Sequence, residues 1–141
     1  MFNSFDNEAV CYANFEITDK TPNDWGIWAE TEEVTADSIT LIIHRENVKG
    51  LTDDMFPAIS YYIEKRSENM IPDDWEKLEF LPGKEPINKY SDLELKTGAK
   101  ERMRFDWKGV FGTLPAGEYR LKLKYKCGEK TKDCCFIFII N

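Results

Sequence analysis

Strict alternation of apolar and charged side chains over one ten-residue segment most constrains how this chain can fold. In residues 118–127 every second position is apolar, and the positions between are mostly basic. The apolar set is Tyr119, Leu121, Leu123, Tyr125 and Cys127, and the basic set is Arg120, Lys122, Lys124 and Lys126. A period of two is that of a β-strand, whose successive side chains point to opposite faces of a sheet. The segment predicts a strand with one buried face and one face in water.

Shorter segments with the same period predict the other strands. They are 38–44, 59–64, 75–80, 102–107 and 133–140, with weaker candidates at 13–18 and 27–33. Turn-forming Pro, Gly, Asn and Asp residues separate them, and only residues 52–56 suggest a single helical turn. This pattern predicts an all-β fold, an antiparallel sandwich or barrel. The inward-facing side chains are expected to be Ile39, Leu41, Ile43, Tyr61, Ile63, Phe105, Trp107, Tyr119, Leu121 and Leu123.

Length and composition indicate one globular domain. A chain of 141 residues is near the commonest domain size, and 42% hydrophobic with 32% charged residues excludes a disordered or fibrous protein. We expect one domain over residues 1–141, with 1–26 as an N-terminal extension or first strand. The longest apolar run, 134–140, is far shorter than the ~20 residues of a membrane span. The first ten residues show no secretory signal.

The formal charge of −7 argues against a nucleic-acid partner, because phosphate backbones attract the opposite sign. The charge is unevenly placed. Residues 1–40 hold one basic and nine acidic residues, whereas residues 81–141 hold thirteen basic and eight acidic ones. The basic surplus is interpreted as a solvated strand face, with a small basic binding face as the alternative.

Residues for catalysis are scarce. The only histidine, His44, lies within a strand pattern, and no Gly-x-Ser-x-Gly turn accompanies it. Residues 112–117 have the Gly spacing of a phosphate loop, but Glu118 and a strand follow instead of a lysine and a helix. The acidic pairs at 53–54 and 73–74 lack calcium-loop spacing. We therefore expect no enzymatic activity, no metal and no cofactor.

The four cysteines leave two interpretations open. Cys134 and Cys135 are adjacent and point to opposite faces of a strand, so with Cys11 and Cys127 they do not form a zinc pattern. Buried free thiols are one interpretation. The other is a disulfide between Cys127 and Cys134, which flank residues 128–133 and would face each other across a hairpin.

Four tryptophans and six tyrosines fit either a β-core or a platform for sugars. Trp107 stands in an inward register and is expected in the core. Trp25 and Trp28 lie near Pro22 and Gly26 and are the best candidates for an exposed ligand platform.

The segment 114–119 predicts a tyrosine corner. Pro115 fixes one φ angle, Gly117 permits a positive φ, and Tyr119 then enters its strand pointing inward. A buried Tyr119 hydroxyl needs a hydrogen-bond partner, and a backbone group of the preceding turn lies within reach.

The order of these segments resembles a family of bacterial immunoglobulin-like domains. The run Trp-Lys-Gly-Val-Phe-Gly-Thr-Leu-Pro-Ala-Gly-Glu-Tyr-Arg-Leu at 107–121 is similar to the family's G-x-L-P-x-G-x-Y-R signature. Other segments follow the family's order. They are the strand at 38–43, Tyr-Tyr-Ile-Glu-Lys-Arg at 61–66, Trp-Glu-Lys-Leu at 75–78 and the final strand at 135–140. The resemblance covers residues 27–140.

This resemblance implies an immunoglobulin-like β-sandwich of about seven to nine strands in secreted or lipid-anchored proteins of Gram-positive-type bacteria. It transfers no catalytic residue. We expect a non-enzymatic extracytoplasmic module for adhesion, spacing or protein binding, with an unknown protein or glycan partner. The alternative is a loop-based enzyme inhibitor or carbohydrate-binding module, because a fold does not fix a function.

The C-terminal strand is apolar on both faces. Phe136, Phe138 and Ile140 share one face, and Cys135, Ile137 and Ile139 share the other. Only one face can fill the core, and an uncovered apolar face beside a free edge favours aggregation. We expect residues 10–17 to cover the outer face of a monomer, with a homodimer as the alternative.

Overall fold

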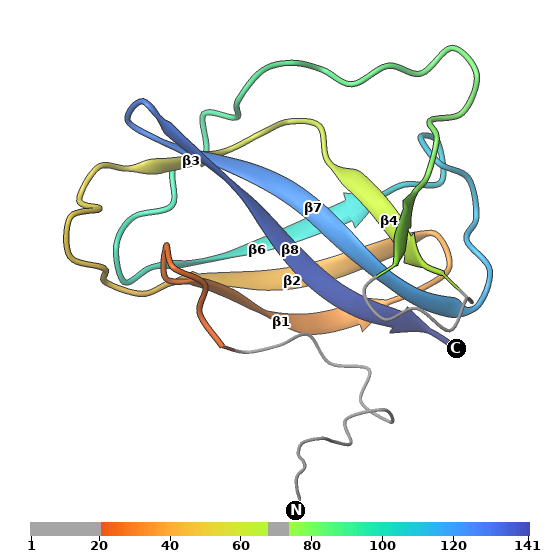
Figure 1. Cartoon of the computed structure of the whole chain (residues 1–141), viewed down its shortest axis with the longest axis horizontal. Coiled ribbons are helices and arrows are strands. Elements are labelled where there is room, and N and C mark those ends of the chain that lie inside the picture. Colours follow the sequence, from red (N-terminus) through yellow and green to blue (C-terminus); the bar gives the residue numbers. More distant parts are fainter. Residues whose placement is uncertain (1–20, 68–73) are drawn as a thin grey trace, which may run out of the picture.

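The alternating segments of the sequence form two antiparallel sheets that pack face to face (Figure 1). The computed structural model describes residues 21–67 and 74–141. In one sheet β2 (Ser38–Arg45) lies between β1 (Ile27–Val34) and β6 (Lys100–Asp106). The second sheet contains β3 (Met55–Pro57), β4 (Tyr62–Arg66), β5 (Trp75–Lys77), β7 (Gly117–Cys127) and β8 (Lys130–Ile140). These eight strands of the described residues make an immunoglobulin-like β-sandwich, as expected.

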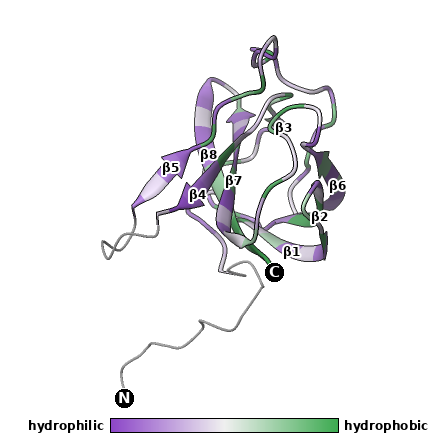
Figure 2. Ribbon diagram, turned by 90° about the vertical axis from the view of Figure 1, so that its right-hand side faces the viewer, coloured by the Kyte–Doolittle hydropathy of each residue, from purple (hydrophilic) through white to green (hydrophobic). Residues whose placement is uncertain are grey.

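Strand β7 organises the five-stranded sheet. It pairs with β8 along its whole length, while β3 and β4 follow one another along its other side and β5 pairs with β4. The chain passes between the sheets after β2, β5 and β6, which places β2 beside β6 and β4 beside β7. Figure 2 shows the two sheets as separate layers. Such crossing connections are those of an immunoglobulin-type sandwich.

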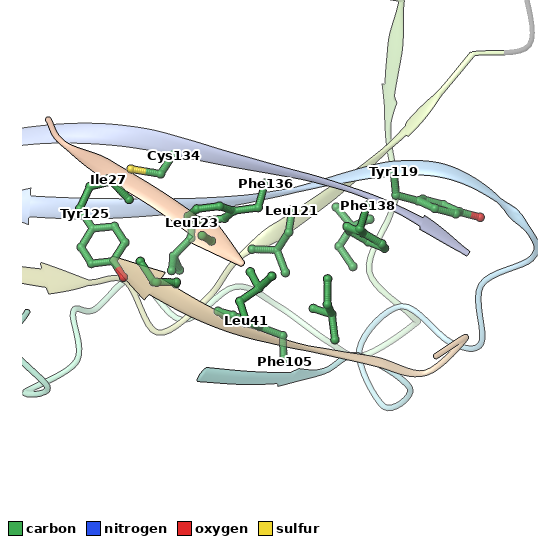
Figure 3. Packing of buried hydrophobic residues seen from close by; sticks show 14 of the residues in the cluster. Ile27, Leu41, Phe105, Tyr119, Leu121, Leu123, Tyr125, Cys134, Phe136 and Phe138 are labelled. Atoms are coloured by element: carbon green, nitrogen blue, oxygen red, sulfur yellow. The ribbon is translucent and has the colours of Figure 1, made fainter. Parts of the chain in front are cut away.

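The core lies where the inner faces of the two sheets meet. Leu121, Phe136 and Phe138 point from β7 and β8 toward Leu41 and Phe105 of the opposite sheet (Figure 3). All predicted inward residues are buried except Tyr61, which is half-buried. The Tyr61 ring still packs edge-on against Phe105, with 5.1 Å between centroids. The period of two therefore identified the core face correctly.

An aromatic stack and a tyrosine corner close one end of the sandwich. The Phe138 ring lies between Trp107 and Tyr119, with centroid distances of 5.5 and 5.7 Å. The Tyr119 hydroxyl donates a hydrogen bond of 2.7 Å to the Pro115 carbonyl, and Gly117 has a φ of 157°. The predicted corner is confirmed, because the buried hydroxyl finds its acceptor in the preceding turn.

A buried arginine organises the other end. Arg45 ends β2 in the inward register of Ile43 and is only 2% exposed. Its guanidinium donates hydrogen bonds to the carbonyls of Leu95 (2.7 Å), Leu51 (2.9 Å) and Asp53 (2.8 Å). A charge taken out of water needs such partners. One side chain thus joins the segments before β3 and before β6.

Two local expectations are wrong. Residues 52–56 do not form a helical turn, because Met55 begins β3 and pairs with Cys127. The strand expected at 59–64 begins only at Tyr62. Residues 58–59 pair with residues 89–90 instead. The Ile59 amide donates to the Lys89 carbonyl, and Ala58 forms a bridge with Tyr90.

The C-terminal strand has one buried face and one outer face, as predicted. Phe136, Phe138 and Ile140 are buried, whereas Cys135 is exposed and Ile137 and Ile139 are half-buried. The expected cover over the outer face, residues 10–17, and the weak strand candidate at 13–18 lie outside the described residues. Among the described residues, no helix is long and apolar enough to cross a membrane.

Removing the corner hydroxyl should weaken the fold without changing it. We expect Tyr119→Phe to lower the free energy of unfolding by about 1 kcal/mol or somewhat more, because one hydrogen bond is lost and the Pro115 carbonyl loses its donor. Urea unfolding followed by tryptophan fluorescence measures the change. Tyr62→Phe is the control, because the Tyr62 hydroxyl makes no hydrogen bond within residues 21–67 and 74–141. Equal stability of wild type and Tyr119→Phe would contradict the role of the corner.

Replacing the buried guanidinium of Arg45 should destabilise the fold more than Tyr119→Phe does. We expect Arg45→Met to lower the free energy of unfolding by about 2–4 kcal/mol, because three carbonyls lose their charged donor. Arg102→Met is the matched control in the same sheet. Arg102 is paired with Glu32 in water, at 2.8 Å, and its loss should have a smaller effect. Equal losses in the two variants would show that Arg45 is not a structural clamp.

Candidate functional site

A groove runs over the outer face of the five-stranded sheet. Its floor is made by outward side chains of β4, β7 and β8, and its wall by Lys77 of β5 and the segment 86–90 between β5 and β6. That segment is part of the long green connection between β5 and β6 in Figure 1. The groove encloses about 520 Å³. The floor residues are Tyr62, Glu64, Lys122, Lys124 and Asp133.

Backbone hydrogen bonds fix the wall of the groove. The Ile59 amide donates to the Lys89 carbonyl at 2.9 Å, and the Ser91 amide donates to the Pro57 carbonyl at 2.7 Å. The Ile87 amide donates to the Ser60 hydroxyl. A long connection without strands is thus attached to residues 57–60 at several points. Attachment of this kind positions the groove side chains on a defined backbone.

Lysines dominate the electrostatics of the groove. Lys77, Lys89, Lys122 and Lys124 line it against two carboxylates, those of Glu64 and Asp133. Glu64 is already paired, because it accepts a hydrogen bond from Arg120 and lies 3.8 Å from the Lys122 ammonium. Lys89 and Lys124 have no ion pair among the described residues. A protein with a net charge of −7 therefore carries a locally positive groove.

Lysine and arginine side chains lie over aromatic rings on this face. The Lys77 ammonium lies 3.9 Å from the centroid of the Tyr62 ring, and the Arg120 guanidinium lies 4.6 Å from the Trp75 ring. Lys126 lies 5.6 Å from the Tyr90 ring. Such cation–π contacts hold the positive groups in place. The same rings are consequently less available for stacking on a sugar.

Three large apolar side chains are exposed on the described part of the surface, and one of them lines the groove. In the described part of the chain, the large hydrophobic residues with high exposure are Ile59 (45%), Ile87 (52%) and Leu93 (58%). Ile87 lines the groove, Ile59 is hydrogen-bonded to the wall, and Leu93 lies farther along the same connection. Ile87 therefore adds an apolar surface to a groove that is lined mainly by polar side chains.

The predicted tryptophan platform is wrong for Trp25. The residue is 8% exposed and belongs to the core. The physical reason is a turn at Asn23, whose side-chain oxygen accepts hydrogen bonds from the amides of Trp25 and Ile27, both at 2.9 Å. This turn directs the chain into β1 with Trp25 facing inward.

Trp28 lies on the outer face of the other sheet and is half-buried. One face of its ring stacks on His44 at 3.9 Å, and its indole N–H donates to Glu46 at 2.8 Å. Nε2 of His44 lies 2.8 Å from a carboxylate oxygen of Glu30. The cross-strand pairing of Trp28 with His44 builds this cluster. His44 and Trp28 thus form one contact on the outer face of the three-stranded sheet.

Of the two interpretations of the cysteines, the Cys127–Cys134 disulfide is wrong, and buried free thiols are found at both positions. The β7–β8 hairpin turns over two residues, Gly128 and Glu129, so Cys127 faces Lys130 and Cys134 faces Leu123. The two cysteines are thus offset by four residues along the strand, about 13 Å, which is beyond disulfide reach. Both thiols are free and buried, and Cys135 is free and exposed.

The sequence pattern predicted that the lysines of β7 lie on a solvent-exposed face, but it did not predict the groove. The wall comes from residues 86–90, which carry no motif. The one available signal was Ile87 and Leu93 within an otherwise polar connection. Elsewhere in residues 21–67 and 74–141, no three His, Cys, Asp or Glu side chains gather closely enough to hold a metal ion.

No family model matches the chain, and no curated protein matches it.

The cysteines should differ in reactivity in the folded protein. Burial raises the pKa of Cys134 to about 12, so at pH 8 its thiol stays protonated and shielded from reagent. Burial also raises the pKa of Cys135, but this side chain is exposed. Brief iodoacetamide treatment at pH 8, followed by peptide mass spectrometry, should label Cys135 before Cys127 and Cys134. A linked Cys127–Cys134 peptide in the non-reduced protein would contradict the hairpin register.

Proposed function

We propose that this protein is a non-enzymatic, immunoglobulin-like binding module that holds a protein partner in the groove beside β4, β7 and β8. The observation that carries the proposal is that one groove with an anchored wall contains both the exposed apolar side chain of Ile87 and lysines that have no ion pair among the described residues. Protein interfaces combine apolar contacts with charges that select and orient the partner. Neither feature is needed for the core, which lies on the other face of the sheet.

The resemblance to bacterial immunoglobulin-like domains supports a site of action outside the cytoplasm, at the surface of a bacterial cell. Adhesion and spacing at that surface are functions that a sandwich of this size performs by binding alone. A partner bound in the groove would be held by the face of one sheet. Both ends of the sandwich would remain available to neighbouring segments or domains.

Carbohydrate binding is the second candidate, supported by Trp28 and the aromatic residues of the groove. It is less well supported, because Trp25 is buried and the Trp28 ring already stacks on His44. In the groove, cations lie over the Tyr62 and Tyr90 rings. Sugar stacking needs a free ring face, which these contacts reduce.

Parallel binding screens test the proposal. The full chain is screened against a displayed peptide library, a glycan array and a panel of proteases assayed for inhibition. We expect enriched peptides whose affinity falls about tenfold in Ile87→Ser. The matched control is Leu93→Ser, because Leu93 is equally exposed on the same connection but does not line the groove. Glycan binding or protease inhibition without groove-dependent peptides would overturn the proposal.

A further inference from the structure

We infer that the groove selects an extended acidic polypeptide segment, whose alternate carboxylates meet the row of basic side chains along β7. This inference rests on the proposed function and names the chemistry of its partner. The row consists of Arg120, Lys122, Lys124 and Lys126, which leave β7 on its outer face.

The spacing of the row matches an extended peptide. Outward side chains of a strand repeat every second residue, about 6.8 Å apart. An extended ligand presents every second side chain on one face with the same repeat. Carboxylates at alternate positions would therefore meet Lys122 and Lys124 in succession, while Lys77 and Lys89 approach from the wall. A compact anion could contact only part of this row.

The lysines can accept new partners at small cost. Lys124 and Lys89 have no ion pair among the described residues, and the nearest carboxylate to Lys122 is 3.8 Å away and shared with Arg120. The two acidic residues in the groove repel an acidic ligand only weakly, because basic side chains lie next to them. Glu64 is neutralised by Arg120, and Asp133 stands beside Lys124 in the β7–β8 register.

Other anionic polymers fit less well. The chain as a whole carries −7, which repels a uniformly charged nucleic acid beyond the groove itself. A sulfated or uronic sugar would gain from ring stacking, but cations already lie over Tyr62, Trp75 and Tyr90. Ile87 adds an apolar contact in the groove wall, which suits the side chains between the carboxylates of a polypeptide.

Three labelled peptides test the inference by fluorescence anisotropy with the full chain. One has five Glu-Thr repeats, the second has five Gln-Thr repeats, and the third has the first composition with all glutamates in one block. We expect the alternating acidic peptide to bind most tightly, and its affinity to fall as salt is raised. The neutral peptide should bind at least about tenfold more weakly.

Charge-matched variants locate the binding. Lys122→Gln with Lys124→Gln should weaken the alternating acidic peptide about tenfold, and Lys77→Gln with Lys89→Gln should do so from the wall. The control pair, Lys100→Gln with Lys108→Gln, removes the same charge outside the groove and should leave affinity unchanged. Circular dichroism confirms that each variant is folded.

The outcomes separate this inference from the proposed function. Equal binding of the acidic and neutral peptides, or equal effects of the groove and control pairs, would overturn the inference. Groove-dependent library peptides would then still support a protein-binding module. Tighter groove-dependent binding of heparin or a single-stranded oligonucleotide than of the alternating peptide would overturn both, because the partner would not be a polypeptide.

Discussion

The pairing of β7 with three neighbours is the constraint on which the rest of the structure depends. This strand fixes β8 on one side and both β3 and β4 on the other, so its register decides which side chains of the sheet face inward. Because a strand alternates its faces, burying Tyr119, Leu121 and Leu123 forces Lys122 and Lys124 outward. A slip of one residue would exchange the two sets. The core and the basic groove are therefore two consequences of one pairing.

The ends of the sandwich are held by different chemistry. At one end Trp107, Phe138 and Tyr119 stack, and polar atoms at their edges reach backbone carbonyls. At the other end Arg45 carries a charge into the interior and is satisfied by three carbonyls. One of these belongs to Leu95, which also pairs with Met55 of β3. Arg45 thereby anchors the base of the connection whose middle forms the groove wall.

The acidic character of the chain and its basic groove are compatible because electrostatic interactions in salt solution act over about 10 Å. Within that distance a ligand in the groove meets four lysines, while the remainder of the molecule is acidic. Three of these lysines, Lys77, Lys89 and Lys124, have no ion pair among the described residues. Rings of Tyr62, Trp75 and Tyr90 hold several of these cations over their faces. A groove of this kind discriminates by charge and spacing, since surrounding negative charge disfavours large uniform polyanions.

The sequence by itself determined the all-β class, the inward set of the long strands and the corner at Tyr119, because each depends on period or on residues a few positions apart. The predicted strand stopped at residue 44, so the inward position of Arg45 was not predicted. Only the tertiary structure decided the rest. A two-residue turn moved Cys134 away from Cys127, a side-chain cap at Asn23 buried Trp25, and residues 86–90 came to face Lys122 and Lys124. These outcomes depend on which distant segments form hydrogen bonds with each other. The local alternation of apolar and polar residues does not specify that pairing.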